Sequence, residues 1–190
     1  MNPFEKFATW YAEAQRPDIQ DPSEMSLATA TPDGVPSVRV VLLKDFDERG
    51  FVFYTNLHSQ KARELTANPR ASLNFRWAPL QRQVRIEGRV EPVTAAEADA
   101  YFASRPRGSQ IGAWASDQSA PLANREDLVR RVAEVEAKYA GSSVPRPPHW
   151  SGFRLIPARI EFWTGKESRL HERELFTRSG KDWHLGLLNP

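Results

Sequence analysis

A run of four aliphatic residues between two cations constrains this chain more than any other feature. The segment from Arg39 to Lys44 reads RVVLLK, which is typical of a β-strand buried on both faces. A buried strand seldom carries a cation at each end unless an anion lies nearby. The alternative is that both charged heads reach solvent while their stems cover apolar surface. Taken alone, the segment favours this alternative, and the rest of the chain changes that balance.

The composition indicates one globular domain over residues 1–190. Of these residues 40% are hydrophobic, and six Trp, ten Phe and four Tyr provide enough apolar surface for a core. No internal repeat or change of composition marks a second domain. The 26 cations and 24 anions are interspersed, so no nucleic-acid-binding arm is indicated.

Several classes of site and location are excluded. The chain has no cysteine, which rules out disulfides, thiolate catalysis and cysteine-ligated metals. Its four histidines lack metal-ligand spacing, so we expect no metal. No apolar run approaches the roughly 18 residues of a membrane span. The first residues have no signal-peptide character, and we expect a cytoplasmic protein with no membrane association.

Short strands and capped helices alternate along the chain. We expect strands at about 25–31, 37–44, 51–55, 71–77, 81–90, 153–163, 170–178 and 183–188. Asn2, Ser59, Thr94 and Asn124 are the expected N-caps of four helices. Short turns between the first three strands predict an antiparallel meander. Roughly seven strands with peripheral helices predict a mainly β, α+β fold, a closed antiparallel barrel decorated by helices.

Residues 54–61 form a first candidate anion site. They read YTNLHSQK, at the end of a strand and the start of a helix. A hydroxyl, the amides of a helix start and Lys61 within one turn can hold a phosphate. Ordinary capping by Ser59, with Lys61 in solvent, is an equally good interpretation.

Residues 101–114 form a second candidate, expected to be an irregular loop after Ser104. Arg105 and Arg107 flank a proline, and arginine binds phosphate with two parallel hydrogen bonds. Hydroxyl groups of Tyr101 and Ser109 can complete an oxyanion shell. From composition alone, a surface loop whose arginines pair with nearby glutamates is favoured.

The segment 163–173 forms a third candidate. If a strand begins at Arg169, then Arg169, His171 and Arg173 share one face. Such a cluster is unfavourable unless it meets water or an anion. Taken together, the three candidates and the RVVLLK strand favour one or two phosphorylated aromatic ligands. Paired carboxylates, a nucleophile–base pair and glycine-rich phosphate loops are missing, which indicates that a cofactor supplies the chemistry.

The segments that carry these clusters resemble the pyridoxamine 5'-phosphate oxidases, the FMN-dependent enzymes of vitamin B6 metabolism. The matching segments are RVVLLK (39–44), FYTN (53–56), RQVRIEG (82–88), SRPRGSQIGAW (104–114), QS (118–119) and IEFWTGKESRLHER (160–173). The resemblance covers nearly the whole chain. It implies an antiparallel FMN-binding split β-barrel that forms a homodimer, with each site between two subunits.

The resemblance also implies roles for individual residues. The FMN contacts would be Arg39, Val40, Val41, Leu42, Leu43, Lys44, Tyr54, Thr55, Gln60, Lys61, Gln83, Gln118, Ser119, Trp163 and Arg173. The substrate contacts would be Lys44, Tyr101, Arg105, Ser109, Arg169, Leu170 and His171, the first four of them on the substrate phosphate. Arg169 and His171 would be catalytic and would hold the pyridine ring against the flavin.

Three features depart from the family pattern or from simple strand geometry. Gln60 stands where the family commonly has Arg, and a neutral hydrogen bond is about half as strong as a charged one. Longer members carry an N-terminal extension over the substrate, whereas this sequence begins almost at its first helix, so we expect that lid to be absent or supplied otherwise. Arg39 and Lys44 are five apart, which places them on opposite strand faces unless the strand is bulged.

The resemblance implies FMN-dependent oxidation of pyridoxamine and pyridoxine 5'-phosphate to pyridoxal 5'-phosphate, with oxygen as electron acceptor. One alternative is a related flavin oxidase of phenazine biosynthesis, against which the set Tyr101, Arg105 and Ser109 argues. A second alternative is a module that binds flavin or pyridoxal phosphate without turnover.

Overall fold

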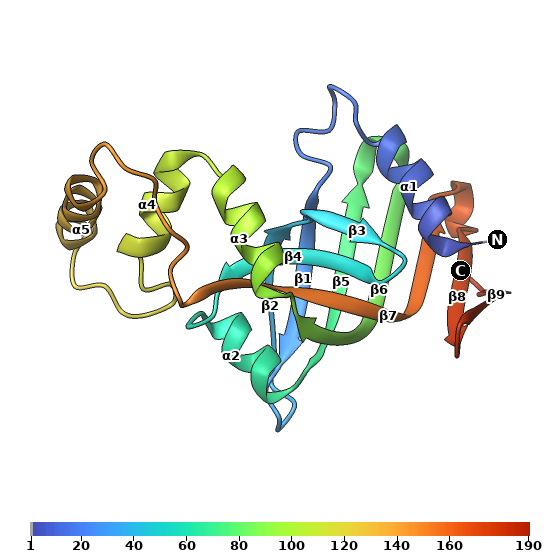
Figure 1. The fold of residues 1–190 in the computed structure, drawn as a ribbon. Coiled ribbons are helices and arrows are strands. Elements are labelled where there is room, and N and C mark those ends of the chain that lie inside the picture. Colours follow the sequence, from blue (N-terminus) through green and yellow to red (C-terminus); the bar gives the residue numbers. More distant parts are fainter. Residues whose placement is uncertain (1) are drawn as a thin grey trace.

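The structure, a computed structural model, describes residues 2–190. Within that range nine strands form one antiparallel sheet with five α-helices around it (Figure 1). The strands are β1 Glu24–Ala30, β2 Pro36–Leu42, β3 Asp45–Asp47, β4 Gly50–Asn56, β5 Arg70–Trp77, β6 Arg82–Pro92, β7 Trp150–Thr164, β8 Glu172–Ser179 and β9 Asp182–Leu187. Among residues 2–190, no helix is both long enough and apolar enough to cross a membrane.

Four of the five α-helices in residues 2–190 begin at the capping residues that the sequence indicates. The helices are α1 Pro3–Glu13, α2 Gln60–Ala67, α3 Ala95–Ser104, α4 Arg107–Ala115 and α5 Arg125–Lys138. The side chains of Asn2, Ser59, Thr94 and Asn124 each accept a backbone N–H from the first turn of α1, α2, α3 and α5. These four predicted caps are confirmed, whereas α4 was not predicted.

The sheet curls into a half-barrel and does not close by hydrogen bonds, so the closed barrel expected from the strand count is wrong. Its order is β2-β1-β5-β6-β7-β4-β3, and β8 and β9 continue from β7 (Figure 1). The predicted meander of the first three strands is wrong, because β4 pairs with β7 and not with β2. Turn signals between neighbouring strands reveal how the chain reverses, but they do not reveal which ladder the next strand joins.

Aromatic side chains fill the inside of the curled sheet. Phe7 of α1 is fully buried and meets the rings of Phe46, Phe51 and Phe75 edge-on, with centroids 4.8, 4.9 and 5.2 Å away. Edge-to-face pairs of this kind add about 1 kcal/mol beyond their buried area. The helical spacing of aromatic residues in α1 therefore serves to attach the first helix to the barrel.

Helices α3, α4 and α5 form a separate lobe beside the sheet (Figure 1). Its small core contains Phe102, Ile111, Val144 and Trp150. Trp150 is also the first residue of β7, so the lobe is attached to the sheet where that strand begins. The edge between lobe and sheet is where the site lies.

The RVVLLK segment differs from the predicted strand in two ways. Val38 and Val40 are 68% and 62% exposed, so the strand is not buried on both faces. The reason is that β2 packs on the core with one face only, so exposed and partly buried side chains alternate along it. The strand also ends at Leu42, and the N–H of Lys44 bonds instead to the carbonyl of Val52 on β4, 2.9 Å away. Because the strand ends before Lys44, the alternation that would place Arg39 and Lys44 on opposite faces does not extend to Lys44.

Candidate active site

A cavity of about 990 Å³ lies between β2, β4, the start of α2 and the helical lobe. Its volume is at the upper end for small-molecule sites, which is room for a cofactor together with a substrate. Most of the predicted site residues line it: Arg39, Val40, Val41, Leu42, Lys44, Tyr54, Thr55, Gln60, Lys61, Tyr101, Arg105, Ser109, Gln118 and Ser119. Segments far apart in the sequence therefore meet at one cavity.

Lys61 is a buried cation that meets only neutral oxygens. Its side chain extends from α2 toward Thr55 Oγ1, Ser59 Oγ and Gln118 Oε1, at 3.2, 3.4 and 3.4 Å from Nζ. No carboxylate lies within ion-pair distance in the described part of the chain, and the residue is only 8% exposed. Burial, and then the charge of Arg39, lower the pKa of the Lys61 amine. The interpretation with Lys61 in solvent is therefore wrong.

Arg39, in contrast, has a carboxylate partner. Its Nη2 lies 3.4 Å from Oε2 of Glu64, which is 7% exposed, and its Nη1 donates to Thr29 Oγ1 at 2.5 Å. Burial acts to raise the pKa of Glu64, but hydrogen bonds from Ser37, Thr29 and Gln60, with the charge of Arg39, lower it to about 2. Glu64 therefore offsets the charge of Arg39. The charge of Lys61 has no such partner, and we call this side of the cavity, at Lys61, its first cationic corner.

Sequence reasoning missed Glu64, although a signal was present. Gln60 and Glu64 are four apart on α2, the spacing at which helix side chains meet, and Gln60 Nε2 donates to Glu64 Oε1 at 2.9 Å. Glu64 thus follows the candidate anion site at residues 54–61 closely in sequence, and such a carboxylate can offset the positive charge of a nearby cation.

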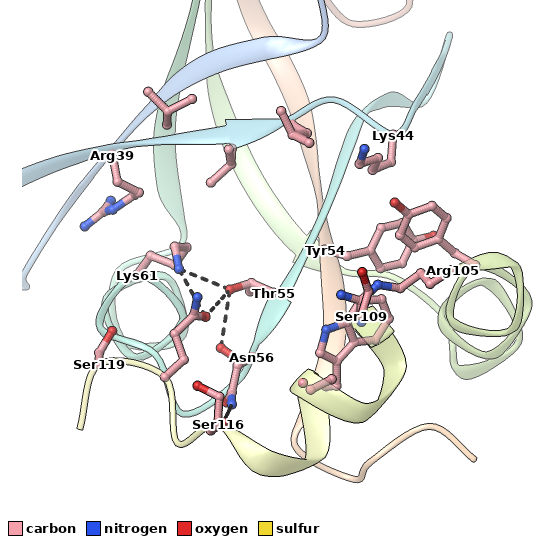
Figure 2. Close-up of a pocket in the computed structure, with 18 of the residues that line it drawn as sticks. Arg39, Lys44, Tyr54, Thr55, Asn56, Lys61, Arg105, Ser109, Ser116 and Ser119 are labelled. Carbon is pink, nitrogen blue, oxygen red and sulfur yellow. Dashed lines mark hydrogen bonds between the residues drawn. The ribbon is translucent and has the colours of Figure 1, made fainter. Parts of the chain in front are cut away.

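Arg105 forms a second cationic corner on the opposite side of the cavity. Its guanidinium lies over the rings of Trp150 and Phe102, 4.7 and 5.6 Å from their centroids. Its Nη1 is buried without a hydrogen-bond partner among the described residues, and burial lowers the pKa of the side chain. Figure 2 shows Lys44, Arg105 and Ser109 on one side of the pocket and Arg39 with Lys61 on the other.

The segment that holds Arg105 and Ser109 is more regular than predicted. The expected irregular loop contains α4, which places Ser109 in the first helical turn after Arg105. Glycines at 108 and 112 lower helix propensity, but burial of Ile111 and Ala115 against the lobe outweighs it. Arg107 donates to the carbonyls of Tyr139 and Ser142, at 2.7 and 2.9 Å, so the pairing of both arginines with glutamates is also wrong.

Stacked rings line the cavity beside Arg105. Tyr54 stacks on Tyr101 with centroids 4.2 Å apart and on Trp150 with centroids 5.3 Å apart. Gly152 stands opposite Tyr54 on the neighbouring strand, and a Cβ there would come within 2.6 Å of the Tyr54 ring. Only glycine therefore lets the ring lie flat at this position. No spacing pattern indicates Trp150, because it follows an irregular proline-rich connector.

The remaining predicted residues do not line this cavity. Gln83, Trp163 and Arg173 stand in one row across β6, β7 and β8, since Trp163 pairs in register with both of the others. We call these three residues the outer row, because neighbours of Trp163 along β7, Ile160 and Phe162, face the core on the other side. Leu43 is also outside the cavity, buried in the main core.

Arg169, Leu170 and His171 lie next to the outer row. The His171 ring is 4.6 Å from that of Trp163, and its Nδ1 accepts the N–H of Lys166 at 3.2 Å. The strand expected at about 170–178 is present as β8, but it begins only at Glu172, after a tight turn. The condition that a strand begins at Arg169 is therefore not met. Ser168 and Arg169 both have positive φ in that turn, 55° and 62°, so strand alternation does not apply to them.

Comparison with known proteins gives a consistent result over the whole chain. Residues 11–139 match the family model described as pyridoxamine 5'-phosphate oxidase. The pyridoxine/pyridoxamine 5'-phosphate oxidase of Myxococcus xanthus is 61% identical over 189 residues, which cover all of this chain and 92% of that protein. The chain belongs to the pyridoxamine 5'-phosphate oxidase family. Residues 150–190 match a second model of the family, described as the C-terminal dimerisation region.

Two solved structures resemble this member of the family. PhzG of Burkholderia lata, in complex with tetrahydrophenazine-1-carboxylic acid, has a TM-score of 0.94 at 36% identity and covers 100% of this chain and 93% of its own. A pyridoxamine 5'-phosphate oxidase-related, FMN-binding protein of Nostoc punctiforme has a TM-score of 0.80 at 16% identity, with 100% and 99% covered. The mainly β fold with peripheral helices, and the split barrel that the resemblance implies, are confirmed.

Proposed function

We propose that this chain catalyses the FMN-dependent oxidation of pyridoxamine and pyridoxine 5'-phosphate to pyridoxal 5'-phosphate, with oxygen as electron acceptor. The observation that carries the proposal is one cavity with two cationic corners, at Lys61 and at Arg105, neither of which has a carboxylate partner within residues 2–190. Two separate phosphate groups fit these corners. The names of relatives that are 53–61% identical along the chain support the same reaction.

The corner at Lys61 fits the phosphate of FMN. The buried Lys61 amine has only neutral acceptors at 3.2 Å or more, so a phosphate oxygen would be a stronger partner than any it has. The N-terminus of α2, capped by Ser59, adds backbone N–H groups near the same point. Gln118 and Ser119 supply further polar groups to the cavity wall.

The corner at Arg105 fits the substrate phosphate. Lys44, Tyr101, Arg105 and Ser109 all line the cavity. Lys44 follows β2, Tyr101 lies in α3, Arg105 lies between α3 and α4, and Ser109 lies in α4. A buried N–H without a partner is unfavourable until an acceptor arrives, so the free Nη1 of Arg105 favours an anion there. Holding the phosphate at this corner places the substrate ring between the two corners.

The chain's own contribution to the reaction is positioning and electrostatics. FMN, when bound, supplies the electron acceptor that the protein's side chains lack. The Arg105 corner fixes one end of the substrate, and this anchoring determines where the reacting carbon lies. The stacked rings of Tyr54 and Tyr101 cover that corner and keep water from part of the cavity wall.

We further propose a homodimer in which a second copy completes each cavity. The outer row and His171 lie outside the cavity of their own chain, in or next to the region that matches the dimerisation model. In this proposal Gln83, Trp163 and Arg173 reach the cofactor of the second copy. Arg169, Leu170 and His171 reach its substrate, with Arg169 and His171 orienting the pyridine ring.

Mixed dimers test the shared site. Arg105→Ala and Arg173→Ala damage opposite halves of the proposed site, so a dimer with one chain of each kind keeps one intact site. At substrate and FMN concentrations too low for either variant alone, co-expression of the two variants should restore activity. Sites built from one chain would stay inactive in the mixture.

The reaction itself is tested by measuring oxygen uptake and pyridoxal phosphate formation with each substrate. Uptake with both B6 phosphates supports the proposal. The structural likeness to PhzG favours a second candidate, oxidation of a phenazine precursor, and uptake only with such a tricycle would select it. Bound flavin without any turnover would select the binding module. The cytoplasmic location remains a prediction that cell fractionation tests.

A further inference from the structure

Glu161 is a buried carboxylate on the outward face of the sheet. It lies on β7 between Ile160 and Phe162, whose side chains are in the main core, so alternation turns Glu161 to the opposite face. Its side chain is nevertheless only 4% exposed, since the guanidinium groups of Arg85 and Arg173 lie against it. The feature that calls for an explanation is a buried anion in a surface that otherwise faces away from the core.

Both carboxylate oxygens of Glu161 accept hydrogen bonds. Oε1 accepts from Nε of Arg173 at 2.7 Å, and Oε2 accepts from Nη2 of Arg85 at 2.5 Å. Nη1 of Arg173 donates to the carbonyl of Asn189 at 3.0 Å, whereas Nη2 has no hydrogen-bond partner in residues 2–190. The Arg173 guanidinium is therefore fixed on two sides and leaves one edge for a ligand.

The two arginines depend on Glu161 to different degrees. Arg85 has a second carboxylate, because its Nε lies 3.0 Å from Oε1 of Glu87. Glu161 is the only carboxylate in ion-pair contact with Arg173 among the described residues. Removing Glu161 would thus leave Arg85 paired, while Arg173 would lose the contact that sets its direction.

We propose that Glu161 is a positioning residue that orients Arg173 toward the cofactor bound in the second copy of the chain. Arg173 ends the outer row with Gln83 and Trp163, and Glu161 lies two residues from Trp163 on the same face of β7. Glu161 contacts Arg173 directly, so we expect its effect on the cofactor to pass through Arg173. This inference rests on the proposed function.

A structural role alone would give a different signature. Removing one partner of a buried ion pair destabilises a fold when the remaining charge stays buried. The side chains of Arg85 and Arg173 are 38% and 26% exposed, so water can hydrate both guanidinium groups once the charge of Glu161 is gone. Glu161→Gln keeps the shape and one acceptor, so we expect the melting temperature of the apo-protein to change little. FMN binding should weaken, because the neutral amide no longer holds the guanidinium of Arg173 in one direction.

The experiment measures the dissociation constant of FMN by flavin fluorescence for the wild type, Glu161→Gln, Arg173→Ala and the double variant. We expect Glu161→Gln to weaken FMN binding about tenfold, the size of one charge-assisted hydrogen bond. The double variant should bind no more weakly than Arg173→Ala, because both changes remove the same contact. With saturating FMN, the kcat of Glu161→Gln should approach the wild-type value.

Glu87→Gln is the matched control. It removes a carboxylate from the same face and from the same partner, Arg85, but leaves Arg173 held, so its FMN affinity should equal that of the wild type. Should Glu161→Gln not fold, Glu161→Asp keeps the charge, withdraws it by one methylene and should weaken FMN binding likewise. Wild-type affinity in Glu161→Gln, or independent losses in the double variant, would overturn this inference alone. A wild-type protein that takes up no FMN would overturn the proposed function with it.

Discussion

The Arg105 guanidinium lies over the indole of Trp150, 4.7 Å from the ring centroid, and has a buried N–H group without a partner. The indole ring packs against one face of the guanidinium and provides no hydrogen-bond acceptor for that N–H group. An anion in the cavity is the partner that the geometry favours. This relationship connects the first residue of β7 with the loop between α3 and α4.

Arg105→Ala should raise the KM for pyridoxamine 5'-phosphate about 10- to 100-fold, since one or two charge-assisted hydrogen bonds to phosphate are lost. Bound FMN should remain, because Arg105 lies at the opposite corner from Lys61. Steady-state kinetics and the flavin content of the purified variant measure both effects. Arg107→Ala is the control, since Arg107 contacts backbone carbonyls outside the cavity, and its KM should not change. Loss of flavin in Arg105→Ala with an unchanged KM would show that the two phosphates are assigned to the wrong corners.

Lys61→Met should make the apo-protein more stable and the FMN complex weaker. The burial that lowers the pKa of Lys61 indicates that its charge is poorly compensated in the folded chain. Replacing that charge by an apolar side chain of similar length should raise the free energy of unfolding by about 1 kcal/mol. Denaturant unfolding of the flavin-free protein and FMN titration check the two effects. A less stable apo-protein would indicate that the neutral contacts of Lys61 already satisfy it.

Glu64→Gln should lower stability at neutral pH but not in acid. The folded protein lowers the pKa of Glu64 from 4.5 to about 2, so its carboxylate stabilises the fold above the unfolded value and loses this effect as pH falls toward 2. The variant should be less stable than the wild type by about 1–3 kcal/mol above pH 5, and the difference should shrink below that. Urea unfolding across this pH range measures it. A difference that stays constant down to about pH 2 would contradict the assigned pKa.

Gln60→Arg should strengthen FMN binding about fivefold or more. The residue lines the cavity at the start of α2 and already contacts Glu64, so an arginine there would add a cation and an ion pair at helical spacing. FMN titration of the variant measures the gain. Gln60→Met, which supplies length without charge, is the control and should show none. Unchanged affinity in Gln60→Arg would place the FMN phosphate away from this turn.

Local signals in the sequence predicted the elements that local physics decides. The N-caps at Ser59 and Thr94 depend on a hydrogen bond within one turn, and both are where the sequence places them. The strand expected at about 81–90 is likewise present as β6, and alternate residues such as Val84 and Ile86 are buried. Family resemblance, and not periodicity, indicated which of the scattered cations would share a cavity.

The errors concern features that depend on distant partners. Helix α4 contains two glycines and forms because Ile111 packs into a core with Trp150, which is far away in the sequence. The apolar run of β2 looked fully buried, yet Val40 is exposed because only one face of that strand packs on the core. Ser168 and Arg169 lie in a turn with positive φ before β8, and residue types such as Ser and Arg do not predict that conformation.

The most direct test of the central claim is the visible absorbance spectrum of the purified protein, before and after anaerobic addition of pyridoxamine 5'-phosphate. The account predicts a flavin band at the start, its loss when the substrate is added, and its return when oxygen is admitted. A protein that stays colourless after incubation with FMN, or whose flavin band is unaffected by substrate, would contradict it.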